Sequence, residues 1–260
     1  MRLLVLSNLD LPSAWALSAL RVALPDADMA LVLTTRVGQV PSESQALLSP
    51  LAAIDRVGLC RYLKVSEQSQ NDALLDALGR RLGCPVSLSP GINRAEGLAL
   101  IASFDPDLIV SIRFGEILKL PAIRRARRGV LNLHSGRLPQ LRGVMATFWA
   151  MLNGDALLGM TVHWVEDSGI DAGTIVSQTR QPLRREASYL ANTLSLYPAG
   201  VSALVDAIKA LKAGQRLPVR LARGQARYYG YPSLKDFERF DAAGHQLVDP
   251  RDIESLPVVE

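Results

Sequence analysis

Residues 107–133 read DLIVSIRFGEILKLPAIRRARRGVLNL, and this stretch decides the fold class. Its two ends, 107–112 and 129–133, are short apolar runs of the length and composition of buried strands. Pro121 opens a short helical segment between them. A strand, a helix and a second strand in this order predict two parallel strands joined by a crossover helix.

The same alternation continues toward the N-terminus. Apolar runs predict strands over 2–7 (RLLVLS), 29–34 (MALVLT) and 84–88, and leucine spacing predicts helices over 17–24, 74–82 and 95–103. Residues 36–50 contain Gly, Pro, Ser and Gln and predict a loop. The pattern as a whole predicts an α/β fold with a Rossmann-like open, mostly parallel sheet and helices on both faces.

The pattern changes after residue 160. Two period-two segments, TVHWV and TIVSQT, flank the turn-rich EDSGIDAG and predict two antiparallel strands beside the parallel sheet. One long helix is expected over 186–212. We therefore expect a catalytic domain over 1–212 and a short C-terminal extension over 213–260. Five aromatic residues of the extension either pack on the domain, which we favour, or form a stacking wall for a substrate: Tyr228, Tyr229, Tyr231, Phe237 and Phe240.

Composition excludes several classes of protein. Of the 260 residues, 48% are hydrophobic and 21% charged, which is too apolar for a disordered chain. The two cysteines, Cys60 and Cys84, have no CxxC spacing, which excludes a disulfide scaffold and a zinc ribbon. The N-terminal apolar run is too short for a signal peptide or a membrane span. We therefore expect a cytoplasmic protein with no membrane partner, and a homodimer is left open.

The formal net charge of +4 permits an anionic partner without demanding one. The densest basic cluster consists of Arg124, Arg125, Arg127 and Arg128. It is either a patch that contacts RNA or phosphate, or a solvated helix end whose positive charge complements the helix dipole. No aromatic residues interleave with the arginines, so we favour the solvated helix end and expect no nucleic-acid partner.

Polar residues concentrate between residues 130 and 171. Asn132 and His134 lie two positions apart at the end of an apolar strand, so their side chains share one face. His163 lies in the next predicted strand, and Asp167 and Asp171 follow it. An amide, an imidazole and a carboxylate suit acyl transfer through a tetrahedral intermediate, although each residue alone could simply cap backbone groups or begin a turn.

Residues 131–178 resemble the signature of the folate-dependent formyltransferases, the family of the glycinamide ribonucleotide, methionyl-tRNA and sugar N-formyltransferases and of formyltetrahydrofolate hydrolase. The matching elements, in order, are Asn132 and His134, Leu138-Pro139, Arg142-Gly143, a helix with Trp149, Gly159 and Thr161, and Asp171 and Gly173. The resemblance implies the formyltransferase fold, 10-formyltetrahydrofolate as formyl donor and no required metal. It also implies catalytic roles for Asn132, His134 and Asp171. Asn132 would donate to the developing oxyanion, His134 would stabilise the same charge, and Asp171 would take a proton from the acceptor's ammonium.

The resemblance also places the folate and the acceptor. The pterin would bind between two segments, which are Phe114, Gly115, Glu116, Ile117 and Leu118, and Val165, Glu166, Asp167, Ser168, Gly169 and Ile170. Arg142 and Gly143 would face the acceptor. Because few residues follow the long helix, we expect a small-molecule amine, such as an amino sugar or a modified amino acid. Within the family, a methionyl-tRNA formyltransferase and a formyltetrahydrofolate hydrolase remain possible functions.

Three hypotheses from different classes of protein compete with this one. A metal-dependent hydrolase would use His134, His163 and Asp171, whose spacing matches no compact ligand motif. A serine hydrolase would use Ser135, but the chain has no GxSxG motif. A non-enzymatic RNA-binding module would use the arginine cluster. We expect His245, in the extension, to have no specific role.

Overall fold

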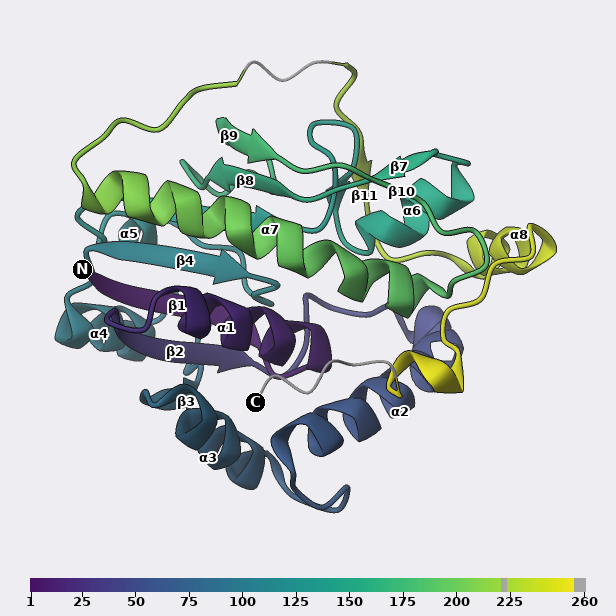
Figure 1. Ribbon diagram of the computed structural model, residues 1–260, viewed down its shortest axis with the longest axis horizontal. Coiled ribbons are helices and arrows are strands. Elements are labelled where there is room, and N and C mark those ends of the chain that lie inside the picture. The colour runs from purple at the N-terminus through teal and green to yellow at the C-terminus, as the bar shows by residue number, and fades with distance from the viewer. Residues whose placement is uncertain (221–223, 255–260) are drawn as a thin grey trace.

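The computed structural model describes residues 1–220 and 224–254 of the chain. Seven strands form one sheet in the order β3-β2-β1-β4-β5-β8-β9 (Figure 1). The five strands from β3 to β5 pair in parallel. β8 and β9 continue the sheet in antiparallel pairing. The bounds of the seven strands are β1 Arg2–Asn8, β2 Asp28–Thr34, β3 Val86–Leu88, β4 Leu108–Ile112, β5 Val130–His134, β8 Thr161–Trp164 and β9 Ile175–Gln178.

Helices cover both faces of the sheet, and alternation along the strands divides the core between them. Leu3 and Val5 of β1 belong to the larger core, with α1 and α7, whereas Leu4 and Leu6 belong to a second core, with α4 and α5. The predicted α/β class with a mostly parallel sheet is therefore confirmed. The helices are α1 Leu11–Ala23, α2 Ser42–Leu63, α3 Asn71–Leu82, α4 Ala95–Phe104, α5 Leu120–Ile123, α6 Ala146–Leu152, α7 Tyr189–Lys212 and α8 Leu234–Ala242, with a short 3₁₀ turn over Pro250–Asp252.

One expectation about the first half is wrong. Residues 36–50, predicted to be a loop, include the first turns of α2, which begins at Ser42 and runs through Pro50. The polar residues that suggested a loop lie mostly on the exposed side of the helix. The C-terminal half of α2 is anchored in the core by Leu59 and Cys60.

The C-terminal extension divides into two parts with different surroundings. Phe237 and Phe240 of α8 are buried against Phe148 of α6, as the packing interpretation predicted. Tyr228 and Tyr229 form a short strand, β11, which pairs with β6 (Arg142–Gly143). A further two-stranded pair joins β7 (Leu157–Leu158) to β10 (Gln181–Pro182).

Among the described residues, α7 is the one helix long and apolar enough to cross a membrane. More than half of its most apolar stretch is buried inside the fold. The helix packs against α1 and the sheet, so its apolar stripe is accounted for by the core.

Candidate active site

Asn132 and His134 lie on β5, at the edge where the parallel strands end. Across the antiparallel pair with β8, Asn132 is opposite His163 and His134 is opposite Thr161. The register of β8 with β9 shifts between Val162 and His163, which makes a bulge of the kind often found beside functional sites. The strands thus bring an amide and two imidazoles to one face of the sheet edge.

Asp171 is the residue on which these side chains converge. It lies in the loop between β8 and β9, and its backbone adopts a left-handed φ of 48°. Its Oδ1 accepts a hydrogen bond from Nδ2 of Asn132 (3.2 Å) and its Oδ2 accepts one from the backbone N–H of Gly143 (2.9 Å). Nδ1 of His134 lies 3.3 Å from Oδ2, and Nε2 of His163 lies 3.4 Å from Oδ1.

The carboxyl group of Asp171 is ionised at neutral pH. Burial opposes its charge, but the nearby His134 and His163 and the N–H of Gly143 outweigh the burial and lower its pKa from 3.8 to about 2. A buried negative charge beside a cavity can hold an ammonium group and accept a proton from it.

Both histidines are oriented by backbone carbonyls. Nε2 of His134 lies 2.6 Å from the carbonyl of Leu141, and Nδ1 of His163 lies 2.9 Å from the carbonyl of Trp164. Since a carbonyl can only accept, each of these nitrogens carries a proton. Nε2 of His163 lies 3.0 Å from Nδ2 of Asn132. The two amide hydrogens of Asn132 are therefore directed at His163 and Asp171.

A cavity of about 550 Å³ opens beside these residues, within the size range of small-molecule sites. Asn132, His134 and Asp171 line it, as do Gly143 and Ser135. Nine of the eleven residues predicted to hold folate also line it: Phe114, Gly115, Glu116, Ile117, Leu118, Val165, Asp167, Gly169 and Ile170. The sheet edge therefore carries a slot beside the polar cluster.

The first predicted folate segment is held in place by tight packing and hydrogen bonds. A side chain at Gly115 would collide with the carbonyl of Arg36, because a Cβ there would lie 1.8 Å from that oxygen. The carboxylate of Glu116 accepts hydrogen bonds from Ser89 and from the backbone N–H of Ile92. Both contacts fix the backbone of this segment against neighbouring loops.

Three residues that were predicted to bind the folate or the acceptor do not line the cavity. Glu166 bonds to the backbone and hydroxyl of Thr174, and neither it nor Ser168 is among the residues that line the cavity. Arg142 is also outside that lining, and its Nε donates to the carbonyl of Ile170 at 2.8 Å. The structure therefore gives Arg142 a role in holding the loop that carries Asp171.

Sequence reasoning did not assign several residues that line the cavity. His163 was noted in the polar stretch but was left out of the catalytic set. The loop residues Val37, Gly38, Gln39 and Pro41 also line the cavity, as do Tyr189, Tyr228, Tyr231 and Arg113. Arg113 carried a detectable signal, because an arginine directly follows the five buried residues of β4.

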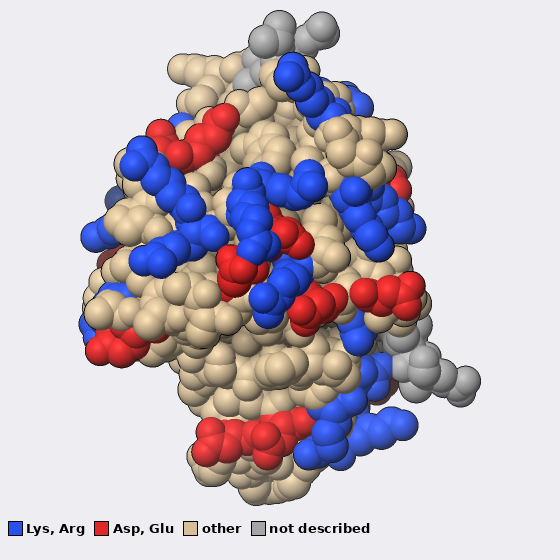
Figure 2. Space-filling model, turned by 90° about the vertical axis from the view of Figure 1, so that its left-hand side faces the viewer, with Lys and Arg blue, Asp and Glu red and all other residues tan. Residues whose placement is uncertain are grey.

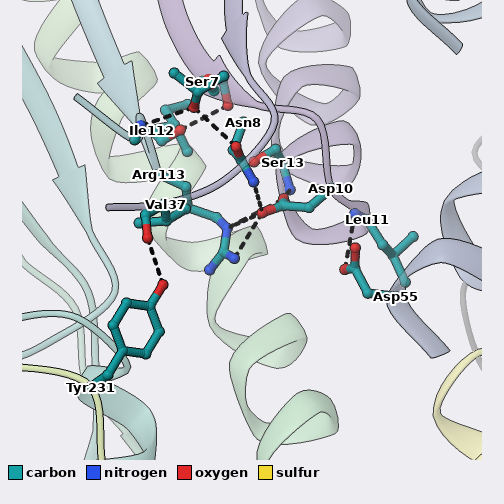
Figure 3. Close-up of polar contacts among 12 residues, drawn as sticks. Ser7, Asn8, Asp10, Leu11, Ser13, Val37, Asp55, Ile112, Arg113 and Tyr231 are labelled. Carbon is teal, nitrogen blue, oxygen red and sulfur yellow. Dashed lines mark hydrogen bonds and ion pairs between the residues drawn. The ribbon is translucent and has the colours of Figure 1, made fainter. Parts of the chain in front are cut away.

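Arg113 and Asp10 form a buried ion pair (Figure 3). Nε of Arg113 lies 3.1 Å and Nη2 lies 2.8 Å from Oδ2 of Asp10. Asp10 is also the N-cap of α1, where it accepts from the backbone N–H of Ser13 at 2.8 Å, and Asn8 donates to it at 2.7 Å. Burial opposes the charge of Asp10, but Arg113 and these hydrogen bonds outweigh the burial and lower its pKa.

The arginine cluster lies on a face of mixed charge. Figure 2 shows basic and acidic side chains intermixed there. Arg127 pairs with Asp105 and Asp107, and Arg128 donates to the carbonyl of Leu211 in the last turn of α7. These contacts favour the interpretation of the cluster as a solvated face.

A metal centre and a serine nucleophile find little support in the geometry. In the part of the chain that the structure describes, no group of three or more His, Cys, Asp or Glu residues is arranged to hold a metal ion. Ser135 lines the cavity, but the ring nitrogens of neighbouring His134 are directed at Leu141 and Asp171. His245 packs against Phe240 in the extension, away from the site.

Comparison with known proteins matches residues 89–208 to the family model described as formyl transferase. Methionyl-tRNA formyltransferase of Synechococcus sp. (strain JA-3-3Ab) is 29% identical over 199 residues, which cover 75% of this chain and 61% of the relative. That of Desulfotalea psychrophila is 34% identical over 139 residues, or 53% and 42% of the two chains. The chain thus matches less than two thirds of the length of these relatives.

Solved structures with the same fold are more distant in sequence. Glycinamide ribonucleotide transformylase 1 from Symbiobacterium toebii superposes with a TM-score of 0.60 at 17% identity, covering 86% of this chain and 94% of the other. The sugar 3N-formyl transferase WlaRD superposes with a TM-score of 0.58 at 15% identity, covering 88% and 69%. The part of the chain that the formyl transferase model matches, residues 89–208, contains Asn132, His134 and Asp171.

Proposed function

We propose that this protein transfers a formyl group from 10-formyltetrahydrofolate to the amine of a small-molecule acceptor. The observation that carries the proposal is the convergence of Asn132, His134 and the N–H of Gly143 on the ionised Asp171, beside a cavity large enough for a flat heterocycle. The family match of residues 89–208 supports the same reaction.

The residues of the cavity fit a folate. Phe114, Leu118, Val165 and Ile170 supply apolar walls for the flat rings. When bound, the folate supplies the formyl group and a nitrogen that leaves after transfer. Every other step of the proposal is carried by side chains of this chain.

Asp171 attracts the acceptor's ammonium group and takes its proton, directly or through a water molecule, which frees the nitrogen lone pair for attack. Asn132 donates an N–H to the negative charge that develops on the formyl oxygen, a contact worth about 3 kcal/mol of barrier. Since both its amide hydrogens are already directed at His163 and Asp171, one of them has to change partner in the reaction. His134 likewise has to release the carbonyl of Leu141, after which its Nε2–H stabilises the same charge and passes a proton to the leaving nitrogen.

The test separates binding from transfer. We expect 5-formyltetrahydrofolate, an unreactive isomer of the donor, to raise the thermal unfolding temperature of the protein. We expect 10-formyltetrahydrofolate to be converted to tetrahydrofolate, with formylated product, when a suitable amine from a panel of amino sugars and amino acids is present. Absence of folate binding would refute the proposal.

Two related reactions are distinguished in the same assay. Release of formate at the same rate with and without amines would identify a hydrolase. Because the matched relatives are methionyl-tRNA formyltransferases, charged methionyl-tRNA belongs in the acceptor panel. If that tRNA is formylated faster than any small amine, methionyl-tRNA is the acceptor and the proposed small-molecule acceptor is wrong.

A further inference from the structure

A fixed cation, Arg113, lines the cavity directly before Phe114 of the first predicted folate segment. Arg113 follows β4 directly and adopts a left-handed φ of 57°, a conformation that is costly for a residue with a side chain. Its side chain is 23% exposed, whereas that of Asp10 is 9% exposed. Arg113 therefore combines a buried ion pair with access to the cavity.

One edge of this guanidinium bonds to Asp10, and another edge faces away from Asp10. Nε and Nη2 bond to Asp10, and Figure 3 shows the remaining nitrogen pointing away from Asp10. Asp10 is itself fixed by Asn8 and by the N–H of Ser13, so the orientation of the guanidinium is set before any ligand arrives. A preoriented N–H edge of this kind matches a carboxylate.

The other charged residues of the cavity limit which kind of anionic ligand can bind at Arg113. Arg113 is the only Lys or Arg among the described residues that line it, whereas Glu116, Asp167 and Asp171 bring three carboxylates. A phosphorylated acceptor would place two or more negative charges among these carboxylates, against one cation already paired with Asp10. A zwitterion, with an ammonium group near Asp171 and one carboxylate at Arg113, suits this distribution.

The position of Arg113 favours a carboxylate that belongs to the acceptor over one that belongs to the folate. Phe114 and Val165, from the predicted folate segments, pack on the core beneath α4 and α5. Asp10 at the start of α1 and Tyr189 at the start of α7, which lie with Arg113, belong to the opposite face of the sheet. The folate's own glutamate carboxylates are the other source of the same chemistry, and the experiment separates the two.

We infer that the formyl acceptor is a small amino acid, whose carboxylate binds the guanidinium of Arg113 while its amine faces Asp171. The inference rests on the proposed function and names its substrate class.

Binding measured by calorimetry, on protein saturated with 5-formyltetrahydrofolate, tests the inference without turnover. The probes are two matched pairs that differ by a carboxylate, ornithine with putrescine and lysine with cadaverine, together with thymidine diphosphate. We expect the amino acid of at least one pair to bind at least about tenfold more tightly than its decarboxylated partner. Equal affinity within both pairs, no measurable binding of either amino acid, or tighter binding of thymidine diphosphate would overturn the inference.

The double variant Asp10→Asn/Arg113→Gln removes both charges of the pair together and keeps a residue that can cap α1. We expect it to lose the preference for the amino acid and to bind 5-formyltetrahydrofolate as wild type does. The variant Arg127→Gln, which changes an arginine of the mixed-charge face, is the matched control and should keep the preference. If the double variant does not fold, Arg113→Lys, which keeps the charge and loses the planar fork, should reduce the preference.

The folate arm uses 5-formyltetrahydropteroate, which lacks the glutamate. If the double variant weakens binding of 5-formyltetrahydrofolate and leaves that of the pteroate unchanged, Arg113 binds the folate tail and the inference is wrong. If wild type binds the amino acids selectively but forms no formylated product, the carboxylate site stands and the proposed transfer reaction fails.

Discussion

Replacing Asp171 by asparagine keeps the shape of the side chain and removes the charge that, in the proposed reaction, holds the acceptor's ammonium group. We expect turnover to fall on the order of a hundredfold for Asp171→Asn, and similarly for Asn132→Ala and His134→Ala. The measurement is kcat/KM for folate conversion, with circular dichroism to verify folding. Asp206→Asn, on the exposed side of α7, is the control and should retain wild-type rates. Wild-type rates in all three site variants would contradict the assignment.

Asp55 should make the stability of the protein depend on pH. Burial and the neighbouring Asp10 raise its pKa from 3.8 to about 8, although Arg113 and the N–H of Leu11 oppose the shift (Figure 3). The folded state thus favours the protonated acid, so this contribution is full below about pH 4 and is lost as the pH rises to about 8.

We therefore expect Asp55→Asn, which cannot ionise, to raise the unfolding temperature at pH 8 by several degrees and to change it little at pH 4. Thermal unfolding of both proteins across that range is the measurement. A stabilisation that is the same at both pH values would show that Asp55 is not the titrating group.

The convergence of Asn132, His134 and Asp171 could be predicted from the sequence, whereas their catalytic roles stay a prediction. Asn132 and His134 are two positions apart, and the resemblance supplied Asp171. The partners of Asn132 could not be predicted in the same way. They depend on the register of β8 against β5, which brings His163 opposite Asn132.

At the scale of elements, strands and helices were predicted well where their pattern of apolar residues was strong. β1, β2, β4 and β5 are buried on both faces, and their continuous apolar runs revealed them. The first turns of α2 have no such apolar pattern, because few of their side chains reach the core. Contacts distant in sequence hold them, such as the hydrogen bond from Ser44 to the carbonyl of Pro232.

The pairing of β6 with β11 should be sensitive to a single methyl group. A Cβ at Gly143 would lie 2.1 Å from the carbonyl of Tyr229, and its φ is 99°. We expect Gly143→Ala to separate the two strands, displace the N–H that bonds Asp171, and reduce both turnover and the unfolding temperature. Gly154→Ala is the matched control, since Gly154 also has a positive φ, of 74°, but open space around it. Equal losses in both variants would mean that backbone strain alone, without the clash, causes the effect.

At the scale of the whole molecule, the extension is both a wall of the cavity and a part of the core. Tyr228 and Tyr231 line the cavity, and the hydroxyl of Tyr231 donates to the carbonyl of Val37 at 2.5 Å. Trp149 stacks on Tyr229, and its Nε1 donates to the carbonyl of Gly230. Sequence composition indicated that the aromatic residues matter but could not separate these two roles, because both require aromatic side chains.

Phe240 tests whether the extension and the α/β domain unfold together. Its ring stacks on that of Phe148 with centroids 4.3 Å apart, and only 2% of the residue is exposed. Truncation to alanine leaves a cavity between α8 and α6, so we expect Phe240→Ala to reduce the free energy of unfolding by about 3–5 kcal/mol. The measurement is chemical denaturation followed by fluorescence and by circular dichroism, and Leu234→Ala, half-exposed on the same helix, should change little. If the extension and the α/β domain unfold together, both probes report a single transition of the variant, at a lower denaturant concentration than in wild type. A separate early transition of the tryptophan signal, with the far-ultraviolet signal unchanged, would show that the extension unfolds alone.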